Sequence, residues 1–408
     1  MDYGSISRES VVVVGASLAG IRAAQRLRRD GFAGRLTLVG DEPHEPYDRP
    51  PLSKQLLAGE WDAGRTALVA ADKLAELELD LRLGVRATAL DQQARTVALD
   101  DGSNVGYDGL LIATGARARS LPGAGELTGV HVLRTLDDCL ALRADLEAQP
   151  ARVVVIGAGF IGAEVAATAR ERGLEVTMLE GLPQPMGRVL GDELGALMAE
   201  IHRERGVDVR CGVQVEALLG TDRVSGVRLA DGTTIDAEVV VIGIGVIPNT
   251  EWLEGSGLTI DDGVVCDATC LAAPDITAAG DVARWPNELF GETMRVEHWD
   301  NAVEQGAVAA RRLFVSETEA EPFTPAPWFW SDQFDCKIQL AGRAGPDDDA
   351  ELITGSVEER RFAILYGRAG RLVGVFGMNR PRHVMQYRTR IAEGMSFPDA
   401  LAIARDAS

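Results

Sequence analysis

The stretch Val11–Gly20 reads VVVVGASLAG, and the stretch Val153–Gly162 reads VVVIGAGFIG. In both, four apolar residues precede a glycine-rich turn, a helix-forming segment follows, and that segment ends near a glycine, at Gly31 and at Gly173. A second apolar run comes next in each copy. Strand, turn, helix and strand is the order of a βαβ unit, whose parallel strands are buried on both faces and are therefore apolar throughout. The sequence predicts an α/β protein with two such units.

Both turns carry the spacing that allows a backbone to hold a dinucleotide. The first position needs glycine for the sharp turn from strand to helix, the second for the approach of a pyrophosphate, and the third for close packing of helix on strand. The N–H groups at the start of the helix then face the phosphate charge. Serine replaces the middle glycine in the first copy, so the three positions are Gly15, Ser17 and Gly20 there, and Gly157, Gly159 and Gly162 in the second copy.

An acidic residue stands at the end of the second strand of each unit, Asp41 in the first and Glu180 in the second. A carboxylate there accepts hydrogen bonds from ribose hydroxyls. A glycine-rich turn on its own also occurs simply to close a strand–helix corner, but two complete arrangements in one chain predict two bound dinucleotides. Glu180 favours NADH, because its charge repels the 2′-phosphate of NADPH. The first arginine that follows it is Arg188, eight residues on.

The composition disfavours several classes of protein. A chain of 408 residues suffices for two or three domains, and a net charge of −21 argues against binding to nucleic acid or to anionic membranes. The sequence lacks the ~18-residue apolar run of a membrane span, and its polar start is unlike a signal peptide. Five scattered cysteines without a CxxC predict free thiols and a cytoplasmic protein. Cys266 and Cys270 alone make a poor metal site, so no metal is expected.

Further segments resemble one family of flavoproteins. YDRPPLSK at residues 47–54 and PWFWSDQ at residues 327–333 are the most specific of them. The segments run in the family's order from near residue 10 to about residue 380, and the sequence from Glu393 onward matches least. The family is that of the FAD-dependent NADH:ferredoxin reductases, of the putidaredoxin reductase, rhodocoxin reductase and dioxygenase ferredoxin reductase type. The other matching segments are Ala113–Gly115, Leu133–Leu136, Ala279–Asp281 and Glu297–Ala302.

The resemblance implies an α/β fold with two Rossmann-like dinucleotide-binding domains, glutathione-reductase-like, and a C-terminal α+β domain. The FAD-binding domain comes in two parts, because the NAD-binding domain is inserted into it. Segments rich in Gly and Pro supply suitable boundaries. The expected segments are 1–115 for the first part of the FAD-binding domain, 116–245 for the NAD-binding domain, 246–322 for the second part of the FAD-binding domain and 323–408 for the C-terminal domain.

The resemblance also implies roles for single residues. Lys54 and Glu164 would pair where nicotinamide meets flavin, and we expect them to be catalytic. The simpler interpretations are a solvated surface lysine and a glutamate that favours the start of its helix. The expected contacts to NADH are made by Gly157, Gly159, Phe160, Ile161, Gly162, Glu180, Gly243 and Gly245.

The residues expected around FAD surround the first glycine-rich turn in sequence or are carried over from the family. Arg49 has the alternative interpretation of a solvated charge, and the tryptophans that of core or partner-contacting aromatics. The expected contacts to FAD are made by Gly15, Ser17, Ala19, Gly20, Asp41, Arg49, Lys54, Ala87, Ala113, Thr114, Gly115, Arg134, Asp281, Trp299 and Trp330.

Residues 1–138 contain no cysteine. Disulfide reductases with this architecture carry a redox pair near the first helix, and peroxidases and oxidases carry one cysteine, so we expect the flavin to pass its electrons on directly. FAD takes two electrons from NADH and can release them singly, which suits a [2Fe–2S] ferredoxin. The resemblance thus implies a ferredoxin–NAD(+) reductase that serves a cytochrome P450 or a ring-hydroxylating dioxygenase, as a monomer or weak homodimer.

Three other functions stay open at this point. A rubredoxin reductase or an NADH oxidase would use the same cofactors with a different acceptor. An NADH-responsive flavin-bound interaction or sensor protein, in the manner of apoptosis-inducing factor, would hold its reduced state instead of turning over. Electron transfer to a carrier separates these possibilities from the first.

A basic segment stands out in this acidic chain, because residues 360–392 contain arginines but no Asp or Glu. We expect part of it to dock the ferredoxin, since local charge complementarity steers association even when net charges repel. The alternative is that these arginines pair with surrounding acidic residues as solvated faces. The candidate docking residues are Arg380, Arg382, Arg388 and Arg390.

Overall fold

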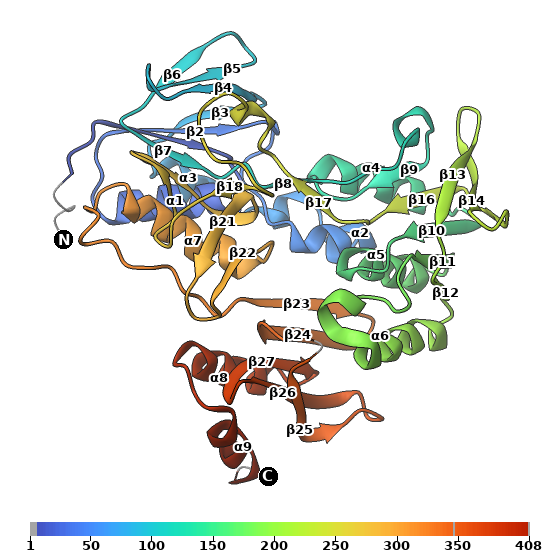
Figure 1. Ribbon diagram of the computed structural model, residues 1–408. Helices are drawn as coiled ribbons and strands as arrows, with labels where there is room; N and C mark the ends of the chain where they lie inside the picture. The colour runs from blue at the N-terminus through green and yellow to red at the C-terminus, as the bar shows by residue number, and fades with distance from the viewer. Residues whose placement is uncertain (1–5, 346, 407–408) are drawn as a thin grey trace. The chain divides into compact units, whose positions relative to one another are not determined.

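The computed structural model describes residues 6–345 and 347–406 (Figure 1). The chain divides into two compact units, each assembled from three separate segments of sequence. The chain crosses between the units five times: after Asp48, after Thr66, and within strands β8 (Ala116–Ala118), β17 (Val246–Pro248) and β23 (Trp328–Gln333). Unit 1 comprises Met1–Asp48, Ala67–Arg117 and Ile247–Phe329, and unit 2 comprises Arg49–Thr66, Ala118–Val246 and Trp330–Ser408.

Unit 1 is built around a mostly parallel sheet with the strand order β19-β20-β7-β1-β2-β3. β1 (Ser10–Val14) lies inside this sheet, between β2 (Arg35–Gly40) and β7 (Gly109–Ile112), and it is parallel to both. The four valines of β1 are at most 3% exposed, as a strand covered on both faces requires. The remaining strands are β3 (Asp80–Leu83), β20 (Ile276–Ala278) and β19 (Leu271–Ala273).

Helices cover one face of this sheet, and a small antiparallel sheet covers the other (Figure 1). α1 (Leu18–Arg29) and α7 (Trp299–Arg312) lie side by side, so close that a Cβ atom on Gly306 would be 2.4 Å from the carbonyl oxygen of Ala19. The small sheet consists of β4 (Ala87–Asp91), β5 (Thr96–Leu99) and β6 (Asn104–Gly106). Unit 1 also contains α3 (Ala71–Ala75) and the sheet of β18 (Val264–Val265), β21 (Ala283–Asn287) and β22 (Glu292–Arg295).

Unit 2 contains a second parallel sheet, with the strand order β12-β11-β10-β16-β9. β10 (Arg152–Ile156) lies between β11 (Glu175–Glu180) and β16 (Val239–Ile242), as β1 lies between β2 and β7 in unit 1. The outer strands are β9 (Val130–Val132) and β12 (Asp208–Cys211). The predicted repeat of a βαβ unit is therefore confirmed: in both copies an apolar first strand is flanked by parallel neighbours.

The helix after β10 is α5 (Phe160–Glu171), and it ends before Gly173, as α1 ends before Gly31. Both glycines have positive φ, +86° and +98°, a conformation that stops a helix at little cost for glycine. No helix within residues 6–345 and 347–406 is both long and apolar enough to cross a lipid bilayer. The other elements of this part of unit 2 are α2 (Gln55–Ala58), α4 (Leu136–Glu147), α6 (Gly187–Glu204) and the antiparallel sheet of β13 (Val215–Gly220), β14 (Val224–Leu229) and β15 (Thr234–Asp236).

The last part of the chain forms an antiparallel sheet packed against two helices, as the α+β prediction requires. The sheet has the strand order β23-β24-β27-β26-β25. Glycines on the sheet allow both helices to pack closely against it. A Cβ atom on Gly377 would lie 2.4 Å from the side chain of Val384, and one on Gly367 would lie 2.4 Å from the ring of Phe397. The elements after β23 are β24 (Cys336–Gly342), β25 (Asp349–Ser356), β26 (Arg361–Arg368), β27 (Arg371–Met378), α8 (Pro381–Ala392) and α9 (Phe397–Asp406).

The three glycines of the second glycine-rich turn, at residues 157–162, differ from one another in how closely other backbone atoms approach them. A Cβ atom on Gly157 would lie 2.3 Å from the carbonyl oxygen of Gly243, and one on Gly162 would lie 2.0 Å from the carbonyl oxygen of Gly157. Both contacts are with backbone, which cannot move aside. A Cβ atom on Gly159, by contrast, would have no atom within 4 Å among residues 6–345 and 347–406, its two chain neighbours aside. The fold itself thus requires the first and third glycines but not the second.

Two alanine substitutions test this distinction. We expect Gly162→Ala to lower the stability of the protein by about 2 kcal/mol, the cost of overpacking a tight contact, which corresponds to a fall in Tm of about 4 to 8 °C. Gly159→Ala, made as the matched control without added nucleotide, should keep Tm within about 1 °C, because its methyl group meets open space. Thermal melting followed by circular dichroism measures both. Equal Tm values for the two variants would contradict the packing argument.

Candidate functional site

The two helices that follow the glycine-rich turns start without a side-chain cap. α1 begins after Ser17 and α5 after Gly159, and neither start has a capping hydrogen bond from a side chain. α4, by contrast, begins with a reciprocal capping box between Thr135 and Asp138. The first N–H groups of α1 and α5 are therefore available to an anion, and the helix dipole adds partial positive charge at the same place.

The open space at Gly159 is where a phosphate would approach α5. Two large apolar side chains are exposed near this turn: Ile161, in the first turn of α5, is 48% exposed, and Ile244, just after β16, is 37% exposed. Both follow strands that are neighbours in the sheet, β10 and β16. Ligands of parallel α/β sheets bind at this kind of position, outside the carboxyl ends of adjacent strands.

Glu180 ends β11 and is held over the turn by backbone donors. Its carboxylate accepts hydrogen bonds from the N–H of Ala158 at 2.8 Å and from the N–H of Leu182 at 2.8 Å. These bonds fix its orientation beside the glycine-rich turn and leave further lone pairs for a ligand. Asp41, which follows β2 in unit 1, is more loosely held: it is exposed, and its ion pair with Arg86 is 3.9 Å long.

The first turn packs as the second does. A Cβ atom on Gly15 would lie 2.0 Å from the carbonyl oxygen of Ala113, and one on Gly20 would lie 1.8 Å from the carbonyl oxygen of Gly15. Ala113 follows β7, so the loop after that strand borders the turn. The next residue of this loop, Thr114, is tied to Asn249 by two hydrogen bonds, of 2.8 and 2.9 Å. Asn249 was not predicted from the sequence.

Three further predicted residues of unit 1 lie at the starts of elements or in a short turn, where hydrogen bonds or burial hold the local structure. Asp281 follows β20 in a short 3₁₀ turn, and the N–H of the preceding Gly280 donates to Gln305 on α7 at 2.9 Å. Trp299 starts α7, and its Nε1 donates to Asp48 at 2.8 Å. Ala87, at the start of β4, is buried at 7% exposure.

Glu164 is a buried charged side chain on the second turn of α5. It is 3% exposed within a continuous buried run of that helix, residues 162–169. Lys54 pairs with it: Nζ lies 3.0 Å from Oε1, and the lysine side chain is 12% exposed. The structure thus brings together the two residues that were predicted to be catalytic, and Lys54 does not have the solvated setting of its simpler interpretation.

The remaining donors to Glu164 come from residues that the sequence analysis did not single out. Ser331 Oγ donates to Oε1 at 2.7 Å, and the N–H of Asp332 donates to the same oxygen at 3.3 Å. Ser53 Oγ donates to Oε2. A buried carboxylate is costly unless it is fully hydrogen-bonded, and this one has four donors. Ser53 lies in the PPLSK segment and Ser331 in the PWFWSDQ segment. The sequence analysis therefore identified both segments, but nothing in them indicated the role of these two serines.

The other predicted residues of unit 2 are placed as follows. Arg49 donates to the carbonyl oxygen of Arg134 at 2.5 Å. Gly245, with φ of +97°, accepts from the N–H of Arg119 at 2.9 Å. Phe160 and Trp330 are half-buried.

The predicted residues divide between the two units. Eleven of the residues expected around FAD lie in unit 1: Gly15, Ser17, Ala19, Gly20, Asp41, Ala87, Ala113, Thr114, Gly115, Asp281 and Trp299. Unit 2 holds the residues expected around NADH, the Lys54–Glu164 pair and the other expected FAD contacts, Arg49, Arg134 and Trp330.

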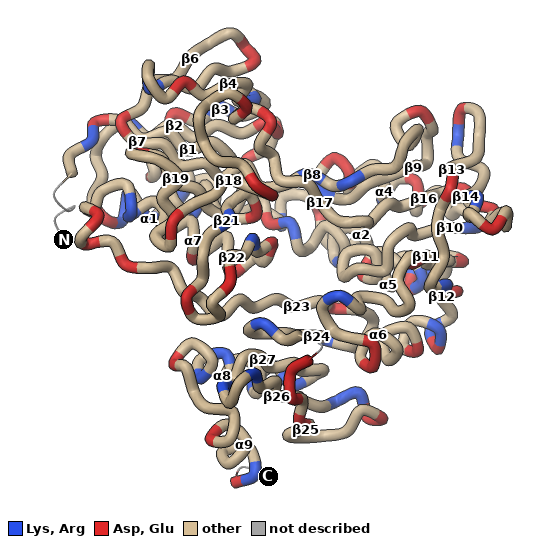
Figure 2. The backbone as a smooth tube through the Cα atoms, viewed as in Figure 1, with Lys and Arg blue, Asp and Glu red and all other residues tan. Residues whose placement is uncertain are grey.

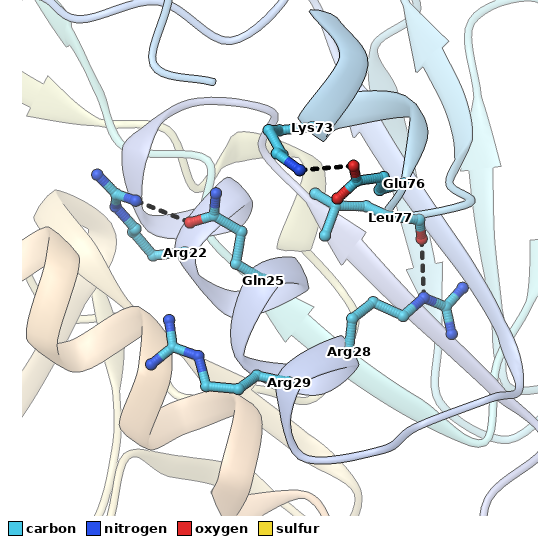
Figure 3. Close-up of a pocket in the computed structure, with 7 residues that line it drawn as sticks. All are labelled: Arg22, Gln25, Arg28, Arg29, Lys73, Glu76 and Leu77. Atoms are coloured by element: carbon cyan, nitrogen blue, oxygen red, sulfur yellow. Dashed lines mark hydrogen bonds and ion pairs between the residues drawn. The ribbon is translucent and has the colours of Figure 1, made fainter. Parts of the chain in front are cut away.

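A hollow beside α1 is lined mainly by charged side chains, unlike the glycine-rich turns (Figure 3). It is lined by side chains of α1 beyond its first turn and by side chains of α3 and the two residues that follow it. Arg28 is committed to structure, since its guanidinium donates to backbone carbonyls of Leu77 and Phe32, among others. Lys73 pairs with Glu76 at 2.6 Å. We assign no ligand to this hollow.

The residues present fit two dinucleotides. Each βαβ unit offers an uncapped helix start, a glycine turn packed against the loop of the adjacent strand, and a carboxylate at the end of the second strand. In the second unit a Cβ atom on the middle glycine, Gly159, would meet nothing within 4 Å in the described part of the chain beyond its sequence neighbours, so the space beside it suits a pyrophosphate.

The comparisons with known proteins agree with this geometry. Residues 9–306 match the pyridine nucleotide-disulphide oxidoreductase family, and residues 328–408 match the reductase C-terminal family. Rhodocoxin reductase of Rhodococcus erythropolis is 41% identical over 402 residues, covering 97% of this chain and 92% of its own. The ferredoxin–NAD(+) reductase component of the p-cumate 2,3-dioxygenase system of Pseudomonas putida is 38% identical, covering 96% of both chains.

A solved structure gives the same result. The covalent putidaredoxin reductase–putidaredoxin complex contains a chain that matches with a TM-score of 0.91 at 36% identity, covering 96% of this chain and 95% of that one. The chain therefore belongs to the pyridine nucleotide-disulphide oxidoreductase family, with a reductase C-terminal domain at its end. It is an oxidoreductase.

Replacing Glu180 tests the assignment of the second site. We expect Glu180→Ser to weaken NADH binding about tenfold or more, the cost of losing hydrogen bonds to a charged acceptor, and to strengthen NADPH binding because the repulsive carboxylate is gone. Titration calorimetry with both nucleotides gives the two dissociation constants. Glu175→Ser is the matched control, an exposed glutamate at the other end of the same strand. Unchanged preference in Glu180→Ser would refute the assignment.

Proposed function

We propose that this chain is an FAD-containing, NADH-dependent ferredoxin reductase that delivers single electrons to a [2Fe–2S] ferredoxin of a cytochrome P450 or ring-hydroxylating dioxygenase system. The observation that carries the proposal is the pair of βαβ units, each with a glycine-rich turn, an uncapped helix start and a terminal carboxylate. One such unit suits one dinucleotide, so two suit a flavin and a nicotinamide. Relatives named as reductases of this kind match along nearly the whole chain.

FAD, when bound, accepts two electrons from NADH and releases them one at a time. In the proposal, the turn Gly15–Gly20 holds the FAD pyrophosphate and Asp281 accepts hydrogen bonds from the ribityl hydroxyls. The turn Gly157–Gly162 holds the pyrophosphate of NADH, and Glu180 binds its ribose. Lys54 supplies positive charge where the flavin gains negative charge, and Glu164 holds Lys54 in place.

The thiol chemistry of the chain supports direct transfer from the flavin to the partner. The first cysteine of the sequence is Cys139. It is fully buried, its Sγ lies 3.1 Å from the carbonyl oxygen of Leu52, and burial raises its pKa to about 12. A thiol in this state is a poor nucleophile at neutral pH, so it does not serve as a redox relay in the proposal.

The proposed docking surface is α8. This helix contains arginines and no Asp or Glu, and Figure 2 shows basic positions along it, while acidic residues are spread widely over the rest of the chain. Arg382 is exposed, and Arg390 stacks its guanidinium 5.1 Å from the ring centre of Tyr387, which orients it. Arg380 and Arg388 complete the proposed surface, α8 with its N-cap residue. Ferredoxins are usually acidic, so a helix of this kind complements them.

The proposal includes the expected organisation of the chain. Its segments are the FAD-binding domain at 1–115 and 246–322, the NAD-binding domain at 116–245 and the C-terminal domain at 323–408. Five free cysteines support a reducing, cytoplasmic location. We propose a monomer or weak homodimer.

Electron transfer to a carrier tests the function as a whole. We expect NADH to drive cytochrome c reduction many times faster when a [2Fe–2S] ferredoxin from the same cell is present, with NADPH a poor substitute. Oxygen uptake is recorded in parallel. Equal oxygen consumption without ferredoxin would identify an oxidase instead, and a yellow protein that NADH bleaches but that reduces neither acceptor would identify a sensor.

A charge-reversal pair tests the docking surface. We expect Arg382→Glu with Arg390→Glu to raise the apparent KM for ferredoxin about tenfold at low ionic strength, and less at high ionic strength because salt screens the attraction. Arg361→Glu with Arg371→Glu is the matched control, two exposed arginines on the sheet of the same domain. The same KM for both double variants at every salt concentration would contradict docking at α8.

A further inference from the structure

A line of buried hydrogen bonds continues behind Glu164. Ser331 Oγ contacts Glu164 Oε1 at 2.7 Å, Gln333 Nε2 contacts Ser331 Oγ at 3.0 Å, and His202 Nε2 contacts Gln333 Oε1 at 2.9 Å. Ser331, Gln333 and His202 are each 0% exposed, and Glu164 is 3% exposed. All four lie in unit 2. The line therefore runs from the Lys54–Glu164 pair to a histidine in the interior of the same unit.

The chemistry of the groups gives this line a single direction. A carboxylate oxygen only accepts, so the Ser331 hydroxyl donates to Glu164. The hydroxyl oxygen then accepts from the amide NH₂ of Gln333, which leaves the Gln333 carbonyl oxygen as an acceptor. His202 must therefore carry its proton on Nε2. Its Nδ1 is buried and has no hydrogen-bond partner within residues 6–345 and 347–406. This agrees with an Nδ1 that carries no proton, because a buried N–H without an acceptor would be more costly.

The surroundings of His202 keep the ring neutral and fixed. Burial lowers its pKa, because the charged imidazolium is poorly stabilised away from water. The ring lies edge-on to Phe334, with centroids 5.2 Å apart. Gln333 is fixed in turn by a second contact, from Nε2 to the sulfur of Met186 at 3.8 Å.

We infer that Ser331, Gln333 and His202 are positioning residues for Glu164: three hydrogen bonds donated in one direction hold its carboxylate in the orientation that pairs with Lys54. The inference rests on the proposed function, in which that pair acts at the cofactors. Successive donors polarise one another, so the last hydrogen bond onto Glu164 is stronger than an isolated one. With Ser53 on the other oxygen, the carboxylate cannot rotate away from Lys54 without losing a donor.

The local sequence explains how the line forms. Side chains two residues apart on a strand point to the same face, so Ser331 and Gln333 on β23 both face the same interior. His202 comes from the last turn of α6, and its position on this face is a tertiary contact. The PWFWSDQ segment thus contributes a polar pair at alternate positions, directly after its aromatic residues.

A spectroscopic experiment tests the direction without relying on activity. The protein is labelled with ¹⁵N-histidine, and correlation spectra of the ring nitrogens report the tautomer of each of the five histidines. His202→Gln assigns the signal. We expect His202 to be neutral and protonated on Nε2, and Gln333→Met to abolish the Nε2 hydrogen-bond shift. A doubly protonated ring, or a proton on Nδ1, would overturn the inference whether or not the protein reduces any ferredoxin.

A kinetic experiment tests the consequence for Glu164. The flavin-loaded protein is mixed rapidly with NADH, and flavin absorbance gives the rate constant of reduction and the NADH dissociation constant separately. We expect Ser331→Ala to slow reduction about tenfold at saturating NADH, the effect of one hydrogen bond to a charged group, with an unchanged dissociation constant. Ser331→Thr, which keeps the hydroxyl, should restore the rate.

Matched amide substitutions provide the control. Gln333→Met should slow reduction as Ser331→Ala does. Gln339→Met should not, since Gln339 is a buried amide on the adjacent strand β24 whose Oε1 has no partner in the described part of the chain. Wild-type rates in Ser331→Ala and Gln333→Met, or equal slowing in Gln339→Met, would overturn the positioning role. Should the wild type itself not be reduced by NADH, the proposed function fails, and the tautomer measurement still decides the inference.

Discussion

Contact between a helix start and the backbone of a neighbouring strand governs how both nucleotide units are built. Gly15 and Gly157 turn the chain with φ of +120° and +99°, and a side chain at either would collide with the backbone after the adjacent strand. Because no side chain intervenes, the helix begins directly above the end of its strand. Its first N–H groups then point into the space beyond the sheet, and that direction makes an anion site of a structural turn.

The second constraint is the burial of Glu164, which lies two residues after the last glycine of its turn. A carboxylate on the covered face of a helix would destabilise the unit unless donors surround it. The donors come from two places in the sequence: Ser53 and Lys54, and Ser331 with the backbone N–H of Asp332. The hydrogen bonds that stabilise this charge therefore also connect three segments of unit 2 that are distant in sequence: residues 53–54, helix α5 and residues 331–332.

The sequence predicted what depends on neighbours along the chain. The βαβ units could be recognised because apolar strands, glycine turns and helix stops follow one another within about 30 residues, the length of such a unit. The pairing of Lys54 with Glu164 needed the family resemblance, since 110 residues separate them. Ser331, Gln333, His202 and Asn249 were missed, because their roles arise from contacts that no local pattern encodes. The segment at 327–333 was singled out only for its family resemblance, and its sequence did not indicate what Ser331 and Gln333 would contact.

Net charge and local charge act over different distances in this protein. The net charge of −21 is distributed over the whole chain. At about 0.1 M salt, the interaction between exposed charges more than ~10 Å apart is largely screened. An approaching acidic partner responds to the charges nearest its own surface. α8 has arginines at its N-cap and along its length with no carboxylate among them, so its local field is positive although the chain is acidic. In the docking that we propose, the acidic remainder has a complementary role, because it would repel an acidic partner from the rest of the surface and leave the basic helix as the favourable place to associate.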